Sequence, residues 1–466
     1  MGQTRALAIV ALLTLLFQLG GAADSSADQP TPAEDPQETT AEGDEASPAP
    51  APEAAGETRE APPPKSPDPI TAASWGESVG FAPDLDGAPG AGSEISAANL
   101  EEWERFVPEG VAKLVESFAL RLPISDYQPV HPSRGYIKAT NRYRGEPTLL
   151  PDHTDARAQG IENYTAGLPF PQPQSGREIA YNYVLAYRGD DGTYHYGVYW
   201  ISADRGVTRW EEWRWEFIRR AQFRTDLDPI PAFPNMEEDE IAGMSLTYAV
   251  SPQDKRGYAS LYHGKVVPED ISAWVYLPPT RRVMQVVVGT KGDAWNSTDL
   301  LYEDIGGYTG HPEWMEWKLL EKRTILAPVH AEIPHGKQAL REAFDFNTWP
   351  HWNLRAKWEP RPVYVVEARP RLTDYPYSRM LVYFDAETFF IPVKVVWDRQ
   401  GRLWKVLINA SNASPDMDTQ PLQVGTALAV DLLSRHATAF PAYDFRANVG
   451  HQPSDFTVTR LRRLGR

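Results

Sequence analysis

Short runs in which apolar and polar side chains alternate, separated by tight turns, occupy most of this chain beyond residue 175. A strand points successive side chains to opposite faces of its sheet, so this alternation predicts strands with one buried face. Tight turns between such runs, as at Gly189–Gly192 and Asp398–Gly401, predict antiparallel neighbours. The predicted strands cover residues 179–187, 194–200, 209–217, 273–277, 283–288, 363–368, 379–385, 391–397 and 403–408.

Helical patterns are fewer. Asn99 followed by Glu102 resembles a capping box, and large apolar residues recur at helical spacing from Leu100 to Phe118, with an interruption at Pro108. A later helix is predicted over residues 421–439, where the apolar positions are Leu422, Leu428, Leu432 and Leu433. The chain is therefore predicted to be mainly β (α+β), with helices and loops covering an antiparallel meander.

The N-terminal residues predict export from the cytoplasm. An apolar run of about 13 residues, Leu7–Leu19, follows Arg5 and precedes small residues up to Ala23. Because a membrane-spanning helix needs about 20 apolar residues, the run predicts a cleaved signal peptide, residues 1–23. Residues 24–72 are rich in Pro, Ala and Glu and are predicted to form a disordered acidic linker. Residues 73–466 are predicted to form a single domain.

The composition of the chain limits the compartments in which it could work and the partners that it could bind. The chain has no cysteine, which excludes a disulfide framework, a thiolate zinc site, a cysteine nucleophile and a lipid anchor on cysteine. A soluble, non-lipidated protein of the bacterial periplasm fits this best. Most of the net charge of −17 comes from the linker, and the remainder shows no basic footprint, so nucleic acid is not a predicted partner.

Motifs that would carry catalysis or bind a metal are not evident. The sequence has no nucleophile elbow, phosphate-binding glycine loop or His-Glu-x-x-His pair. His330 and His335 flank Glu332 at a spacing that can ligate a metal, but scattered histidines are the simpler interpretation. The acidic run Glu237–Glu240 lacks the glycine of a calcium loop and is interpreted as solvated. No cofactor or metal is therefore predicted, although a hydrolase triad cannot be aligned or dismissed from sequence.

Aromatic residues make up 11% of the chain, and many occupy alternate positions of the predicted strands. They could simply pack a large core, or they could line a cavity for a lipid-like ligand. Under the second interpretation, the cavity-lining residues would be Tyr181, Tyr183, Leu185, Trp213, Trp215 and Phe217.

Several segments resemble known families. Three resemble the lipoprotein-sorting (LolA/LolB-like) superfamily: Ala273–Pro278 with Arg281–Val283, Ser297–Ile305, and the series from Val363–Glu367 through Tyr383–Asp385 to Asp398, Gly401, Leu403 and Trp404. Three others resemble the periplasmic family called domain of unknown function 1329 (DUF1329): Val130–Arg134, Gly167–Pro171 and Trp317–Arg323. The segments run in family order from about Asn99 to Trp404.

This resemblance implies a strongly curved antiparallel half-barrel with helices over its concave face. It also implies a non-enzymatic carrier or accessory protein that handles lipids or other hydrophobic molecules, in families often associated with resistance–nodulation–division (RND) exporters and outer-membrane barrels. Two alternatives stay open: an envelope hydrolase, and a ligand-free structural partner of an envelope complex.

Overall fold

The computed structural model describes residues 72–80, 84–151, 160–219, 223–265, 271–286, 292–334, 336–412 and 423–464. The predicted signal peptide and the predicted linker up to residue 71 lie outside these ranges, as does His335. No helix in the described ranges combines the length and the apolar character needed to cross a membrane.

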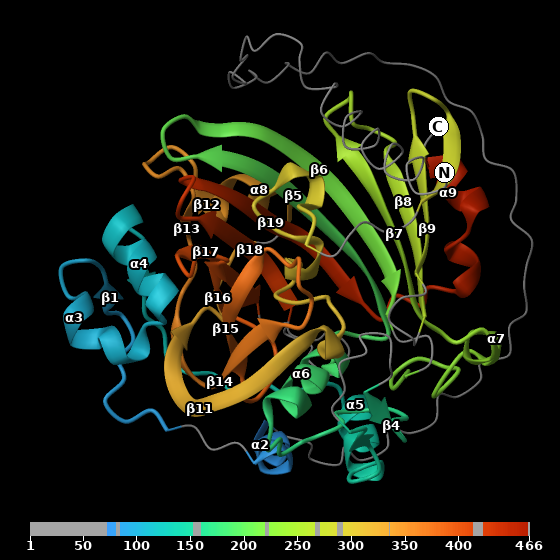
Figure 1. Cartoon of the computed structure of the whole chain (residues 1–466), viewed down its shortest axis with the longest axis horizontal. Helices are drawn as coiled ribbons and strands as arrows, with labels where there is room; N and C mark the ends of the chain where they lie inside the picture. Colours follow the sequence, from blue (N-terminus) through green and yellow to red (C-terminus); the bar gives the residue numbers. More distant parts are fainter. Residues whose placement is uncertain are drawn as a thin grey trace, which may run out of the picture. The chain divides into compact units, whose positions relative to one another are not determined.

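One antiparallel sheet dominates these residues (Figure 1). Thirteen described strands follow one another across it: β10 (Arg282–Val286), β9 (Ile271–Leu277), β8 (Ala259–Lys265), β7 (Ile241–Ser251), β6 (Gly206–Ile218), β5 (Asp191–Ser202), β19 (His436–Ala447), β18 (Gln423–Asp431), β17 (Leu403–Asn412), β16 (Val393–Asp398), β15 (Tyr377–Asp385), β14 (Glu359–Pro370) and β11 (Met315–Ala327). The sheet is strongly curved and does not close, which confirms the predicted fold class.

The sheet consists of two meanders joined by its last strand. β5 to β10 pair in chain order, and so do β14 to β19. β19 then pairs with β5, with Phe445 opposite Tyr194 and Ala439 opposite Tyr199. The pairing of β11 with β14 completes the far edge, so segments far apart in sequence share one sheet.

Helix α6 (Gly176–Leu185) marks the inner face of the sheet. The ring of Tyr183 meets Phe384 of β15 edge-on, with centroids 5.8 Å apart. Residues directly opposite each other on neighbouring strands lie on the same face of a sheet. One such row on the face of α6 takes one residue from each of β15, β16, β17, β18, β19 and β5, in this order: Val382, Lys394, Leu407, Ala429, Thr438 and Trp200. The inner face of β5 therefore carries Trp200, Val198, Tyr196 and Tyr194.

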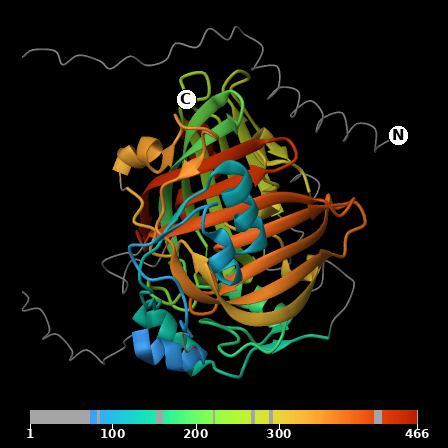
Figure 2. The same cartoon turned by 90° about the vertical axis from the view of Figure 1, so that its left-hand side faces the viewer.

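The outer face is covered by α4 (Glu109–Phe118) and α9 (Val458–Leu464), seen on opposite sides of the curve in Figure 1. Figure 2 shows α4 lying across the strands of the second meander. A Cβ at Gly110 would meet Val395 and Val406 at 2.8 Å, so glycine allows α4 to approach this closely. Leu461 of α9 packs in a core cluster with Leu246 and Leu261.

The remaining described elements are short. Three two-stranded ladders pair β1 (Glu94–Ile95) with β2 (Leu122–Pro123), β3 (Thr148–Leu149) with β4 (Ile161–Glu162), and β12 (Phe344–Asp345) with β13 (Asn353–Leu354). The other helices are α2 (Ala72–Val79), α3 (Leu100–Trp103), α5 (Arg134–Arg142), α7 (Pro234–Glu238) and α8 (Ala339–Glu342), with 3-10 turns at Glu104–Phe106, Trp295–Ser297, Tyr302–Asp304, Pro312–Trp314, Gly336–Gln338 and Pro453–Asp455.

The strand predicted over residues 179–187 is wrong, because most of that run belongs to α6. A capping box begins the helix: the Ser175 hydroxyl accepts from the Glu178 amide, and the Glu178 carboxylate accepts from the Ser175 amide. The alternation of apolar residues was misleading because this helix is buried on most of its surface, including Ile179, Ala180 and Tyr183.

The helix predicted over residues 421–439 is also wrong. Described residues in that range form β18, a turn and the start of β19. Asp431 accepts hydrogen bonds from the amides of Leu433 and Ser434 and so reverses the chain between the two strands. Pairing on both sides, with β17 and β19, outweighs the helical spacing of the leucines.

The predicted helix from Leu100 to Phe118 is confirmed as two helices, α3 and α4, broken before Pro108. Asn99 occupies the N-cap of α3, but its side chain does not cap it. The Asn99 amide instead accepts from the Ser96 N–H and donates to the Glu94 carbonyl, which fixes the preceding turn.

Candidate functional site

Aromatic side chains gather on the inner face of the first meander. Tyr194 and Tyr196 of β5 lie opposite Trp215 and Trp213 of β6, and Phe445 of β19 lies on the other side of Tyr194. Together with two further inner-face residues they form a surface that we call the inner aromatic wall: Tyr194, Tyr196, Trp213, Trp215, Phe217, Tyr262 and Phe445. Small residues of β7, Ala249 and Thr247, lie opposite the two tryptophans.

The rings of this wall contact one another. Tyr194 is 5.6 Å from Phe445 and 6.3 Å from Trp215, both edge-on, and Trp215 is 4.5 Å from Phe217. Gly192 lies opposite Phe217, and a Cβ there would come within 2.9 Å of its ring. Glycine at this position therefore lets the Phe217 ring lie flat against the sheet.

Exposure differs along the wall. Trp213 and Phe217 are buried, whereas Tyr194, Tyr196, Trp215 and Tyr262 are half-buried. Burial nevertheless raises the pKa of Tyr196 well above its ordinary value, with further contributions from Tyr194, Glu211 and Tyr262.

Residues 292–314, which connect β10 to β11 and which we call the covering segment, are anchored to the inner face. At one end, Asn296 donates to Glu211 at 3.1 Å and the Ser297 carbonyl accepts from the Trp200 indole at 3.0 Å. At the centre, Asp299 accepts from the Thr438 hydroxyl at 2.8 Å. The covering segment therefore spans the inner face from β6 to β19.

The strongest anchor of the covering segment is a buried ion pair. Asp304 accepts from Lys394 of β16 and from the hydroxyl of Tyr377, and both charged side chains are about 1% exposed. Lys405 lies nearby on β17, and burial lowers its pKa. We call this inner face of β14 to β18, beneath α6 and the covering segment, the covered region; it is filled by protein side chains.

Three predicted cavity-lining residues belong to α6 and not to a strand. Tyr181 is buried and donates to Glu313 at 2.8 Å, and Tyr183 is buried and donates to the Gly306 carbonyl at 2.7 Å. Leu185 is half-buried, and its carbonyl accepts from Tyr136. The structure therefore does not bring these three together with Trp213, Trp215 and Phe217 on one surface.

Sequence reasoning missed Tyr194, Tyr196, Tyr262 and Phe445 as members of the wall. Tyr194 and Tyr196 were recognised as alternating strand residues, and the turn between β5 and β6 could have placed them opposite the tryptophans. Tyr262 and Phe445 could not be placed in the same way, because they reach the wall through curvature and through the long-range pairing of β19 with β5.

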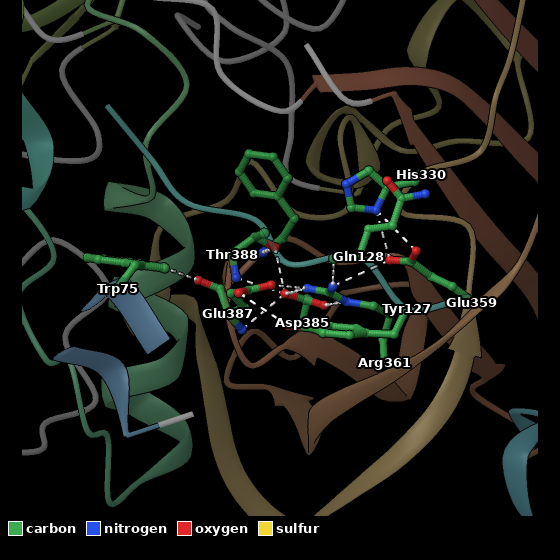
Figure 3. A network of polar contacts seen from close by, with 10 residues as sticks. Trp75, Tyr127, Gln128, His330, Glu359, Arg361, Asp385, Glu387 and Thr388 are labelled. Carbon is green, nitrogen blue, oxygen red and sulfur yellow. Dashed lines mark hydrogen bonds and ion pairs between the residues drawn. The ribbon is translucent and has the colours of Figure 1, made fainter. Parts of the chain in front are cut away.

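A second buried ionic network lies at the start of β14 (Figure 3). Arg361 contacts Asp385 and Glu387 at 2.7 Å and Glu359 at 3.3 Å, and all four side chains are at most 1% exposed. Burial raises the pKa of Glu387 to about 7, against the opposing pull of Arg361. The Glu387 carbonyl accepts from Trp75 of α2, and the Gln128 carbonyl accepts from Arg361, so the network holds N-terminal elements to the sheet.

The metal-ligand spacing of His330, Glu332 and His335 includes one residue, His335, that lies outside the described ranges. His330 lies 3.0 Å from Glu359 at the rim of the Arg361 network, which accounts for its burial. Among the described residues, no group of three or more His, Cys, Asp or Glu side chains is arranged to hold a metal ion.

A groove of about 820 Å³ lies outside the sheet, between the β1–β2 and β12–β13 ladders. Its wall includes Trp349, which is 43% exposed, and both basic and acidic side chains. Arg121 pairs with Glu94 and Lys357 pairs with Glu332, so most of its charge is internally balanced. Its mixed chemistry defines no ligand class.

A family model described as "Protein of unknown function (DUF1329)" matches residues 94–462, which confirms the resemblance seen in the sequence. An uncharacterized protein of Pseudomonas aeruginosa is 25% identical over 338 residues, covering 66% of this chain and 67% of that protein.

Three solved structures show lower similarity to this chain. One is named for outer-membrane lipoprotein sorting and comes from Vibrio parahaemolyticus; it is 18% identical, with a TM-score of 0.43, over 62% of this chain and 98% of that one. A DUF1329 protein from Desulfovibrio piger is 16% identical, with a TM-score of 0.43, over 61% and 97%. A LolA-superfamily protein from Nitrosomonas europaea is 12% identical, with a TM-score of 0.38, over 62% and 100%.

Proposed function

Because the chain belongs to the DUF1329 family, for which the family model names no activity, we propose a function from its inner face. The protein is a periplasmic, non-enzymatic carrier or accessory protein that binds a lipid or another hydrophobic molecule. The ligand lies against the inner aromatic wall. The protein takes part in the transport of such compounds through the envelope.

The half-buried state of the wall carries this proposal. Tyr194, Tyr196 and Trp215 contact other rings on their flanks yet retain exposed surface. Aromatic rings that are packed on several sides and still open on one are what apolar binding surfaces offer, because covering that open side removes apolar area from water. On the same sheet, α6 and the covering segment bury Phe384 and Tyr183 in the covered region, so the aromatic residues described there are closed off.

The buried ionisable groups support a structural role more than catalysis. Asp304 is paired with Lys394, Glu313 with Arg177, and Asp385 with Arg361. Charged groups held in such pairs fix elements in place and are not poised to exchange protons with a substrate. The signal peptide predicted over residues 1–23 supports the periplasmic location. An RND-type exporter and an outer-membrane barrel are the proposed partners, on the family resemblance alone.

Native mass spectrometry of the mature protein from a periplasmic extract tests the proposal. We expect a bound species of low mass that is released at higher collision energy. A fluorescent apolar probe should bind to delipidated protein and be displaced by the extracted material. A wild-type protein that carries no such species and takes up no apolar probe would contradict the carrier function.

β6 supplies a matched pair of variants for the same assay. Trp215 belongs to the inner aromatic wall, whereas Trp210 lies on the outer face of the same strand, opposite Tyr199, and is 42% exposed. We expect Trp215→Ala to weaken probe binding at least fivefold and Trp210→Ala to leave it unchanged. Equal effects of the two substitutions would place the probe elsewhere.

A further inference from the structure

Charge is distributed unequally between the two faces of the first meander. Its outer face carries His195, Glu212, Arg214 and Glu216 at the centre of β5 and β6. The inner-facing positions of β5, β7, β8 and β9 carry no acidic or basic side chain in the residues that the structure describes, and neither do those of β19 from Thr438 onward. On β5, β7, β8 and β9 the inner face therefore carries aromatic, aliphatic, small or hydroxyl-bearing side chains.

The exceptions lie at the margin. On the edge strand β10, Arg282 lies opposite Leu277 beside the β9–β10 turn and is exposed. On β6, Arg209 donates to Glu211 at 3.0 Å, and the other Glu211 oxygen accepts from Trp213 at 2.9 Å. In the covering segment, Asp293 lies close enough to Tyr302 to raise its pKa, after burial and Tyr262. Of these groups, Arg209 is therefore paired with Glu211, Arg282 is separated from the wall strand β8 by β9, and Asp293 is negative.

The wall, through Tyr196, and the covering segment, through Tyr302, also offer hydrogen-bond donors. The hydroxyls of Tyr196 and Tyr302 have no hydrogen-bond partner within the described ranges, although burial raises the pKa of Tyr302 to about 12 and raises that of Tyr196 further. Both phenols are therefore protonated at neutral pH and able to donate. A protonated phenol in an aromatic surface suits a neutral oxygen acceptor, whereas a carboxylate there would lose its hydration without gaining a counter-ion.

We infer that the inner aromatic wall binds an uncharged amphiphile, an apolar body bearing a neutral oxygen acceptor such as an ester, and rejects the corresponding anion. This inference rests on the proposed carrier function and names its ligand class. Tyr196 donates to the acceptor oxygen, while Trp215 and the rings beside it cover the apolar body.

The test uses three fluorescent probes with one hexadecyl-length pyrene tail and different ends: a methyl ester, a carboxylate and a trimethylammonium. Binding is titrated at pH 7.5, below the concentration at which the probes aggregate. We expect the ester to bind at least tenfold more tightly than the carboxylate. A carboxylate or ammonium probe that binds as tightly as the ester overturns the inference and leaves the carrier function standing. Binding of none of the three overturns both.

A variant pair locates the donor. Tyr196→Phe keeps the ring and removes the hydroxyl, so we expect it to weaken ester binding about threefold to tenfold, while a probe with a plain hydrocarbon end binds as before. Tyr248→Phe, on the outer face of β7, is the matched control, because Tyr248 donates to Glu216 away from the wall. Equal losses for the ester and the hydrocarbon probe in Tyr196→Phe would overturn the role of the hydroxyl.

Discussion

The covered region and the inner aromatic wall lie side by side on one sheet, and they differ in how their polar groups are satisfied. In the covered region, Asp304, Lys394 and Tyr377 satisfy one another beneath the covering segment. On the wall, Tyr196 and Trp215 remain half-buried, and the Tyr196 hydroxyl has no described partner. A surface whose polar groups are paired internally acts as core, whereas one that leaves donors and rings open is available to a ligand.

The largest effect should come from breaking the ion pair of the covered region. Lys394→Met leaves the carboxylate of Asp304 buried without its cation, so we expect a loss of about 3–5 kcal/mol in the free energy of unfolding. Denaturant unfolding of the full mature chain measures this loss. Adding Asp304→Asn to the variant should restore part of it, because the uncompensated charge is then removed.

The exposed pair between Arg435 and Asp204 is the control for this comparison, since both side chains are at least half exposed. Arg435→Met should cost about 1 kcal/mol or less. If Lys394→Met costs no more than this surface variant, the covered region is not closed as the structure shows it.

Replacing an aromatic residue with alanine should mainly lower stability in the covered region, whereas on the inner aromatic wall it should also weaken probe uptake. Tyr183→Ala removes a buried ring and its bond to Gly306, so we expect a stability loss of about 3–5 kcal/mol. Trp215→Ala removes a half-buried ring, so we expect a loss of about 1–2 kcal/mol together with weakened probe uptake. If Trp215→Ala is as destabilising as Tyr183→Ala, then the wall is ordinary core.

Most of the sheet could be predicted from the sequence, for a physical reason. In β6, β9 and β14 to β17, a strand with one buried face produces alternation along the chain, and tight turns join several of these strands to their neighbours. The wrong predictions came where alternation of apolar and polar residues is not specific to strands. The run from Ile179 to Tyr187 alternates, yet the capping box at Ser175 and burial on most sides make it helical.

The candidate site was predictable only in part. Trp213, Trp215 and Phe217 were assigned to one face from alternation, and the pairing of β6 with β5 and β7 shows them on one face. The partners that make this face a wall come from β8 and β19, and no local pattern connects Phe445 to Tyr194 across about 250 residues. Charge segregation between the faces likewise needs the register of every strand.

The Arg361 network resembles the covered region, because its charged groups pair with one another inside the protein. It predicts how the stability of the fold depends on pH. Burial raises the pKa of Glu387 to about 7 from an unfolded value of 4.5, so the folded protein holds the proton more tightly. The contribution of Glu387 to the stability of the fold is complete below about pH 4.5 and is lost as the pH rises toward 7. Burial alone would also raise the pKa of Asp385, but the Arg361 charge outweighs it and lowers that pKa, so the contribution of Asp385 is lost only in acid.

We therefore expect the ionisation of Glu387 to lower the unfolding free energy of the wild-type protein between pH 5 and 7, by no more than about 3 kcal/mol. Glu387→Gln cannot ionise and should flatten that part of the profile. The difference between the two profiles isolates Glu387 from other titrating groups. Parallel profiles over this range would show that Glu387 is already ionised in the folded protein.

The smallest expected effect compares the removal of one hydroxyl from each region. Tyr181 donates to Glu313 at 2.8 Å in a buried site, so Tyr181→Phe leaves a buried carboxylate oxygen without this donor and should cost about 1–3 kcal/mol. The Tyr196 hydroxyl has no described partner to lose, so Tyr196→Phe should change the unfolding free energy by less than about 0.5 kcal/mol. Thermal and denaturant unfolding of both variants, without any ligand, measure the difference. A Tyr196→Phe protein destabilised as much as Tyr181→Phe would mean that the Tyr196 hydroxyl is already engaged inside the fold. It could not then be the donor that the wall keeps for a ligand.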